Sequence, residues 1–300
     1  MKKSPKKPTI DLSVIILNYN SGNYLSECLQ SLKRSDLKSY KVEFIIIDNA
    51  SSDNSIALAK SVPIPNTKYQ IPNTNLGFAA GNNYGLKYIS NPRYVLFLNP
   101  DTRVEPNTLA GMIKYFDDHQ YVDAATCNVI LAKTGLTQPE SHRDFPTPLN
   151  ALLHFSGINS GQYFMEHLDY SKLQPINACV GAFLMVKLKV GGAIGWWNEK
   201  YFMYGEDLDF CYKLKLNNFK LFFIPDFKIT HFQGISSGIK KTKSTASRQT
   251  KTRSALATTN AMRIFYQENL IQNYSPFLKP LIMLGINLLE FIRVFKAKYL

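Results

Sequence analysis

The segment Leu12–Leu17 reads LSVIIL and runs directly into Asn18-Tyr19-Asn20. A short, nearly continuous apolar run of this kind is typical of a buried strand in a parallel sheet, because helices cover both faces of such a sheet. Val42–Ile47 and Tyr94–Leu98 repeat the pattern. Stretches with apolar residues at helical spacing separate the three runs. This β-α-β-α-β order predicts a doubly wound α/β sheet.

Polar residues follow each of the three predicted strands at its carboxyl end. In an open α/β sheet, ligands bind beyond the carboxyl ends of the strands. One polar strand end is an ordinary turn signal, whereas three at the same edge predict a binding site. The residues concerned are Tyr19 with Asn20, Asp48 with Asn49, and Asn99 with Asp101.

The second half of the chain mixes strands with helices. We expect a strand over Ala178–Lys187 and a helix over Glu206–Leu216. A further strand over Phe219–Ile224 is predicted to stop at Pro225, because proline has no N–H for the strand ladder. Gly234–Arg253 is rich in Ser, Thr, Lys and Gly, and we expect it to be a loop.

The C-terminal segment Leu281–Phe295 is strongly apolar. It is short for a bilayer span, and Asn287, Glu290 and Arg293 interrupt it. These polar residues do not fall on one clean face of a helix. Two interpretations stay open, namely packing in a core or an oligomer interface, and attachment to a membrane surface.

The composition restricts the class of protein. With 300 residues, 45% of them hydrophobic, the chain has enough apolar material for one large domain, with or without a small appendage. Its net charge of +13 favours an anionic partner such as a nucleotide, a nucleic acid or an anionic membrane surface. The four cysteines form no CxxC pair, and we expect buried thiols in a reducing compartment.

Three places in the chain carry side chains suited to catalysis. A carboxylate at Asp101, after a buried strand, suits Mg²⁺ or Mn²⁺, although Asn-Pro-Asp is also ordinary turn chemistry. Glu206, Asp207 and Asp209 at a helix start suit a general base, and they equally suit the helix dipole. His231 suits a metal or a phosphate, and a lone histidine is also often structural.

Several short motifs occur in one order along the chain. They are DNASSDNS at 48–55, NLGFAAGNNYG at 75–85, LNPD at 98–101, GAFLM at 181–185, FMYGEDLD at 202–209, and His231. In this order and spacing, the chain from about Leu12 to about Ser237 closely resembles glycosyltransferase family 2. Within that family it is most similar to the bacterial rhamnosyltransferase-like branch.

The resemblance implies a GT-A fold, in which a Rossmann-like nucleotide-binding half merges with a mixed-sheet acceptor half. The GT-A domain would span residues 1–260, with the nucleotide-sugar half at about 10–120 and the acceptor half at about 121–260. Residues 261–300 would form a C-terminal helical segment that associates with a membrane or packs in a core.

The resemblance also implies roles for individual residues. Asp207 matches the catalytic base of the family, with Glu206 beside it. Asp101 stands where a DXD-type motif holds the metal, with Asn99 in place of the first acid, and His231 matches a histidine that contacts the metal or the diphosphate. The implied donor site consists of Tyr19, Asp48, Asn49, Gly77, Asn82, Asn99 and Asp101.

These roles predict a metal-dependent, inverting glycosyltransferase that uses Mg²⁺ or Mn²⁺. The expected donor is a nucleotide-diphosphate sugar, with dTDP-L-rhamnose as the first candidate and a UDP-hexose as the alternative. The expected acceptor is a cell-surface polysaccharide or a lipid-linked glycan. Because nucleotide sugars are cytosolic, we expect a cytoplasmic protein attached peripherally to the inner membrane, and an oligomer remains open.

Two other classes of protein fit the sequence less well. A nucleotidyltransferase should carry a basic, glycine-rich phosphate loop after the first strand, whereas residues 18–22, NYNSG, contain no Lys or Arg. A nucleic-acid-binding protein should interleave basic and aromatic residues on one face. The basic runs Lys2–Lys7 and Lys240–Arg253 contain few aromatics, so no nucleic-acid partner is expected.

Overall fold

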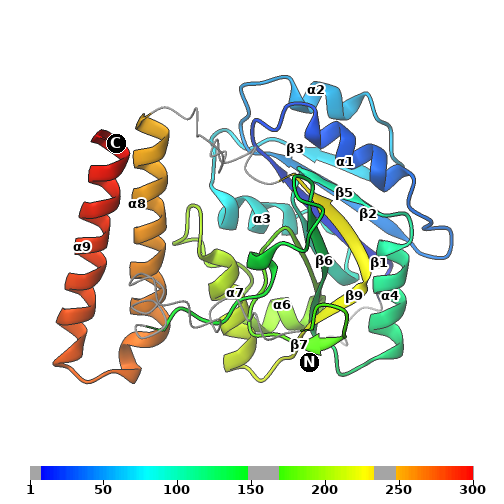
Figure 1. Ribbon diagram of the computed structural model, residues 1–300. Helices are drawn as coiled ribbons and strands as arrows, with labels where there is room; N and C mark the ends of the chain where they lie inside the picture. The colour runs from blue at the N-terminus through cyan, green and yellow to red at the C-terminus, as the bar shows by residue number, and fades with distance from the viewer. Residues whose placement is uncertain (1–7, 148–168, 233–247, 300) are drawn as a thin grey trace, which may run out of the picture.

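The computed structural model describes residues 8–147, 169–232 and 248–299. Within them, a central mixed sheet of nine strands carries helices on both faces, and a helical hairpin stands at one side (Figure 1). The strand order is β3-β2-β1-β4-β8-β6-β9-β5, with β7 beside β9. Residues 233–247, most of the expected Gly234–Arg253 loop, and the N-terminal lysines lie outside the described residues.

The N-terminal half has the β-α-β-α-β order expected from the apolar runs. Strands β1 to β4 pair in parallel, because a helix returns the chain to the same end of the sheet after each of β1, β2 and β3. The elements are β1 (Ile10–Asn18), α1 (Tyr24–Lys33), β2 (Val42–Asp48), α2 (Ser55–Lys60), β3 (Thr67–Gln70), α3 (Phe78–Leu86) and β4 (Pro92–Leu98).

The C-terminal half adds its strands to the same sheet. Strand β8 runs antiparallel to both β4 and β6, which joins the two halves without a break in hydrogen bonding. The elements are β5 (Thr102–Val104), α4 (Thr108–Asp118), β6 (Ala124–Leu131), a short 3₁₀ turn (Pro139–Ser141), β7 (Gln174–Pro175), β8 (Phe183–Lys187), α6 (Leu188–Ile194), α7 (Glu206–Leu216) and β9 (Leu221–His231).

Two expected strands differ from those observed. The strand predicted from Ala178 begins only at Phe183, since the preceding residues form a turn. Strand β9 does not stop at Pro225 but runs on to His231. Its pairing with β6 shifts register there, from Ile224 opposite Cys127 to Lys228 opposite Asn128. A β-bulge thus accommodates Pro225, which has no N–H to donate, and the hydrogen bonding between β6 and β9 resumes beyond it.

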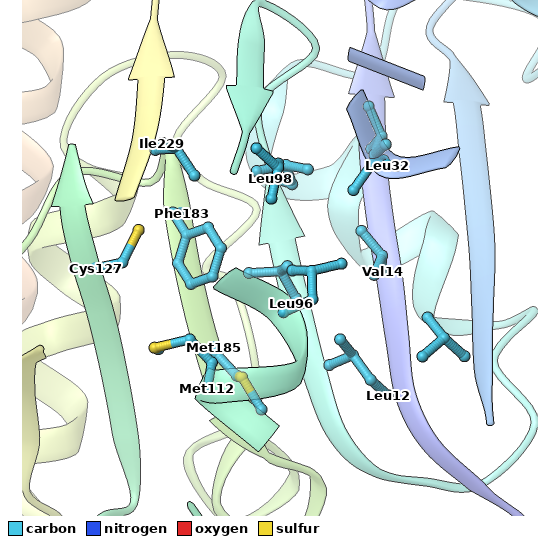
Figure 2. Close-up of a cluster of buried hydrophobic side chains, with 14 of the residues drawn as sticks. Leu12, Val14, Leu32, Leu96, Leu98, Met112, Cys127, Phe183, Met185 and Ile229 are labelled. Atoms are coloured by element: carbon cyan, nitrogen blue, oxygen red, sulfur yellow. The ribbon is translucent and has the colours of Figure 1, made fainter. Parts of the chain in front are cut away.

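Two hydrophobic clusters lie on opposite faces of the sheet. Successive residues of β1 belong to opposite clusters, with Val14 in the first and Ile15 in the second. Figure 2 shows the first cluster, in which Leu96 and Phe183 from neighbouring strands meet Met112 of α4. The second cluster lies under α3, α6 and α7. All four cysteines are buried thiols, as the sequence predicted.

The C-terminal segment forms a helical hairpin that packs on the second cluster. Its first helix is α8 (Arg248–Phe265), followed by a π-helical turn (Tyr266–Leu270), a 3₁₀ turn (Ile271–Asn273) and α9 (Leu278–Tyr299). Residues 248–253, which we expected in the loop, are therefore helical, in line with the helix-favouring Arg, Gln and Lys among them. Among the described residues, no helix is both long and apolar enough to span a membrane.

Candidate active site

The carboxyl ends of β1, β2 and β4 meet at one edge of the sheet, as the sequence predicted. Asn18 pairs with Asp48 across β1 and β2, and Ile16 pairs with Leu98 across β1 and β4. Asp48 is buried, and its Oδ1 accepts a 2.8 Å hydrogen bond from Asn18 Nδ2. This bond orients the Asp48 carboxylate.

Two further predicted donor residues, Tyr19 and Asn99, lie at the same edge. The Tyr19 side chain is 36% exposed there, so its ring is accessible to a ligand. Asn99 follows β4 directly and is half-buried.

Asn49 shapes the edge through the loop that precedes α3. Its Nδ2 donates to Asn75 Oδ1 at 2.9 Å, and its Oδ1 accepts from Leu76 N at 2.8 Å. Gly77 in this loop has φ +81°, and a Cβ there would lie 2.4 Å from the Phe202 carbonyl oxygen. Only glycine fits this conformation and this close approach. Asn49 and Gly77 thus build the wall of the site, and their direct contact with a donor stays a prediction.

Asn82 lies inside α3 rather than on the open edge. Its side chain is 2% exposed, and its Nδ2 donates to the Phe78 carbonyl oxygen at 3.0 Å. The side chain is thus turned back onto its own helix. A direct contact of Asn82 with a ligand stays a prediction.

Asp101 and His231 are brought together by strand pairing. Thr102 of β5 lies opposite His231 of β9, and Phe232 N donates to the Asp101 carbonyl oxygen at 2.9 Å. The Nε2 atom of His231 lies 3.3 Å from Asp101 Oδ1, and both side chains are buried.

Asp101 and His231 together resemble part of a cation-binding site. Gln138 Oε1 lies 2.8 Å from His231 Nδ1, and because an amide oxygen accepts, Nδ1 carries the hydrogen. In the neutral ring, Nε2 then presents a lone pair towards Asp101. Asp101 Oδ1 has no hydrogen-bond partner among the described residues. Two buried acceptors that face each other fit a shared cation, and an oxygen and an imidazole nitrogen are suitable ligands for Mn²⁺.

A second acidic group begins helix α7, as the sequence predicted. The helix starts at Glu206 after Gly205, whose φ of +83° turns the chain sharply into it. Glu206, Asp207 and Asp209 are all buried in the first turn. The helix dipole favours negative charge at this end. The last residue of the helix, Leu216, is 60% exposed.

Asp207 is paired with a cation. Arg143 Nη2 lies 2.5 Å from Asp207 Oδ2, and the two side chains are only 15% and 11% exposed. The protein itself thus supplies a positive partner for this carboxyl group.

Glu206 behaves in the opposite way. Burial, followed by the charge of Asp207, raises the pKa of Glu206 to about 8. Its Oε2 has no hydrogen-bond partner among the described residues. At neutral pH, Glu206 is therefore mostly protonated.

Asp209 has a structural environment. Its Oδ1 accepts a 2.9 Å hydrogen bond from Asn269 Nδ2, and its Oδ2 lies 3.8 Å from Lys213 Nζ. The first contact ties α7 to the turn after α8.

Contacts connect the two acidic places around the edge. Asn99 N donates to the Ala182 carbonyl oxygen at 3.0 Å, and a Cβ on Gly181 would lie 3.3 Å from the Phe78 ring. Phe78 N in turn donates to the Phe202 carbonyl oxygen at 2.8 Å. The chain from Phe202 then leads into the first turn of α7.

Two residues of the site were missed from the sequence. Arg143 and Gln138 both lie between β6 and β7, in a stretch without motif or periodic pattern. They act on residues 64 and 93 positions away. The spacing of residues along the sequence does not indicate such pairs. The residue types of Arg143 and Gln138 were the only signal that could have pointed to them.

A family model decides the relationship of this chain to known proteins. The model described as glycosyl transferase family 2 matches residues 13–190, more than half of the chain. The chain belongs to glycosyl transferase family 2. The match covers β1 to β8, with Asp48, Asp101 and Arg143, while α7 and His231 lie beyond it.

Relatives of this family-2 chain with assigned functions are moderately similar in sequence. A low-salt glycan biosynthesis hexosyltransferase, Agl10 of Haloferax volcanii, is 29% identical over 215 residues, which are 70% of this chain and 64% of that protein. The chain thus spans less than two thirds of that relative. Rhamnosyltransferase WbbL of Escherichia coli K12 is 27% identical over 226 residues, which are 73% of this chain and 82% of WbbL.

Solved structures establish the fold of this family-2 chain. A mannosyltransferase of Pyrobaculum calidifontis, in complex with GDP-Man and Mn²⁺, aligns with a TM-score of 0.57 at 16% identity. The alignment covers 98% of this chain and 76% of that one. At this identity the likeness concerns the fold alone. The expected GT-A fold with C-terminal helices is confirmed.

Proposed function

We propose that this chain is an inverting glycosyltransferase whose general base is Asp207. Asp207 would take a proton from an acceptor hydroxyl, and the oxygen would attack the anomeric carbon from the face opposite the diphosphate. The C–O bond to the diphosphate breaks as the new glycosidic bond forms, so configuration inverts. The observation that carries this proposal is the buried ion pair of Asp207 with Arg143, next to Glu206, whose pKa is raised to about 8.

The two neighbours of Asp207 would divide the remaining tasks. Arg143 holds the Asp207 carboxyl group in one orientation through its ion pair. Glu206, being protonated, adds no second negative charge near the diphosphate. Because a base must be ionised to accept a proton, this arrangement favours Asp207 over Glu206.

Asp101 and His231 are the proposed ligands of a divalent metal, Mg²⁺ or Mn²⁺. When bound, the metal would supply Lewis-acid neutralisation of the charge on the departing diphosphate. The buried Asp101 Oδ1, which has no hydrogen-bond partner among the described residues, lies 3.3 Å from His231 Nε2, and this pair supports the assignment. The Mn²⁺ named with the Pyrobaculum mannosyltransferase supports it as well. Among the described residues, no cluster of three or more His, Cys, Asp or Glu forms a complete metal site.

The proposed donor is a nucleotide-diphosphate sugar bound at the carboxyl edge. The carboxylate of Asp48 and the exposed ring of Tyr19 suit a ribose and a base. We propose dTDP-L-rhamnose first, which the rhamnosyltransferase relative supports, and a UDP-hexose as the alternative. The proposed acceptor is a surface polysaccharide or a lipid-linked glycan, used at the cytoplasmic face of the membrane.

A donor screen tests the proposal. Purified protein is incubated with dTDP-rhamnose and a panel of UDP- and GDP-sugars, with Mg²⁺ or Mn²⁺, and release of the nucleoside diphosphate is measured. We expect release from one donor, which falls at least about a hundredfold in the Asp207→Asn variant. Failure of every donor, or equal release by this variant, would contradict the proposed function.

A further inference from the structure

The outward face of α9 carries a continuous apolar stripe. The apolar side chains at 277, 281, 284, 288, 291 and 295 recur every three or four residues, so they share one side of the helix. The stripe consists of Phe277, Leu278, Leu281, Leu284, Leu288, Phe291, Ile292, Phe295 and Tyr299, with exposed fractions between 41% and 86%. It extends along the whole helix, about 30 Å at the rise of an α-helix.

The opposite face of α9 is fixed against α8, so the stripe has no role in packing the hairpin. Ile286 is buried in the second hydrophobic cluster. Glu290 accepts from Thr259 at 2.8 Å and pairs with Arg263 at 3.2 Å. Figure 1 shows α9 as the outermost element of the hairpin, with α8 between it and the α/β body. A flat surface can therefore reach the stripe without meeting the rest of the protein.

The hairpin is strongly basic. Residues 248–299 contain eight Lys or Arg and two Glu, a net charge of +6 out of +13 for the chain. Both glutamates are engaged, Glu290 with Arg263 and Glu268 with Lys200 at 2.6 Å. The hairpin therefore keeps a net positive charge of its own.

Three of the cations surround a hollow where α8 begins and α9 ends. Arg248, Arg253 and Lys298 line it with Thr252 and Leu256, and its volume is about 370 Å³. No carboxylate of the described residues pairs with these three cations. The hollow contains none of the residues assigned to the donor, the metal or the base. Three unneutralised cations at one end of an apolar stripe suit phosphate groups that lie beside acyl chains.

We propose that α9 is the surface by which this protein docks on an anionic lipid bilayer. The stripe lies in the plane of the membrane interface, and the cations around the hollow contact lipid phosphates. A helix with an aromatic and aliphatic face and flanking Lys and Arg is the type that binds in this way. A second copy of the chain is the weaker candidate, because it would bring two surfaces of net positive charge together.

This inference specifies the membrane location proposed above, but it does not depend on the proposed reaction. Its test measures binding alone, so failure of docking and failure of catalysis are separate results.

The test is flotation of the full-length protein with lipid vesicles. Vesicles contain either phosphatidylcholine alone or phosphatidylcholine with about a third phosphatidylglycerol, a fraction chosen to give a negative surface potential. We expect binding to the anionic vesicles that weakens as salt is raised, and little binding to the neutral ones. Equal binding to both kinds, or none to either, overturns the proposal.

Two variants separate the stripe from the cations. Leu288→Glu with Phe291→Glu alters two exposed positions of the stripe and should lower vesicle binding at least about tenfold. Arg248→Gln, Arg253→Gln and Lys298→Gln together should lower it roughly a hundredfold, about fivefold for each cation. Leu216→Glu, at an exposed apolar position of α7, is the matched control and should bind like the wild type.

The same samples test the alternative. Light scattering gives the oligomeric state of the wild type and the stripe variant without lipid. We expect a wild type whose oligomeric state does not change with the stripe substitutions. A dimer that these substitutions dissociate, without any vesicle binding by the wild type, would assign the stripe to a second copy and overturn the proposal.

Discussion

The two acidic places of the site differ in where their balancing charge comes from. At the start of α7 the protein supplies it, since Arg143 pairs with Asp207 and Glu206 is mostly protonated. At the end of β4, Asp101 faces His231 Nε2 and its Oδ1 has no hydrogen-bond donor among the described residues. A buried carboxylate with a partner can act as a base, whereas one without a partner indicates a cation from outside.

The difference also explains why the two places suit different steps. A base must exchange a proton with substrate, so its charge should be held by the protein before substrate arrives. A metal ligand must leave coordination positions open for diphosphate oxygens, so a site with few protein ligands is suitable. The following predictions test this division, from the largest expected effect to the smallest.

The largest effect is expected at Asp101. Asp101→Ala should lower transfer by about a thousandfold or more and weaken donor binding, because the cation that neutralises the diphosphate loses its carboxylate ligand. Kinetics and donor titration measure the two effects. Asp226→Ala, at an exposed aspartate of the β9 bulge, is the control. Full activity of the wild type in excess EDTA would contradict the assignment of Asp101 as a metal ligand.

Asp207→Asn should lower the transfer rate by roughly a hundredfold or more while donor affinity changes little. The amide keeps the shape of the side chain but accepts no proton, so the loss falls on the transition state. Glu206→Gln should be milder, since Glu206 is already mostly protonated at neutral pH. If Asp207→Asn transfers at the normal rate and Glu206→Gln is inactive, then Glu206 and not Asp207 is the base.

Arg143→Gln should lower transfer by roughly tenfold, through poorer placement of Asp207. The loss should fall on the transfer rate while donor affinity changes little, because only the placement of the base is disturbed. Arg143→Lys keeps a cation beside Asp207 and should restore part of the rate. An equal loss of rate in both variants, together with a lowered unfolding free energy, would mean that Arg143 only supports the fold.

The last prediction concerns stability instead of transfer. The pKa of Glu206 is raised from 4.5 to about 8 by folding, so its contribution to stability is full below about pH 4.5 and is lost as pH rises through 8. Glu206→Gln removes this loss. The variant should therefore gain about 4 kcal/mol in unfolding free energy relative to the wild type between pH 5 and pH 9.

Urea unfolding at pH 5, 7 and 9 measures this gain. Glu105→Gln, at an exposed glutamate, is the control and should show none. If the stability difference between Glu206→Gln and the wild type does not grow with pH, then the folded protein does not hold Glu206 in its protonated form.

The sequence by itself determined the order of elements in the N-terminal half and the edge where their strands end. Uninterrupted apolar runs such as Leu12–Leu17 report burial on both faces, and their β-α-β order leaves few arrangements. Polar residues after such strands must share one edge, so Asp48 and Asp101 could be grouped in advance. The bounds of α7 also followed from local signals, as Gly205 and three acids mark its start.

Only the tertiary structure decided which side chains meet. The β5–β9 register places His231 beside Asp101, and it depends on a bulge at Pro225 that sequence rules predicted as a strand end. The pairing of Arg143 with Asp207 joins segments 64 residues apart. Periodicity reports which face of an element is buried, but partners so distant in sequence are chosen by strand register and packing, which no local pattern encodes.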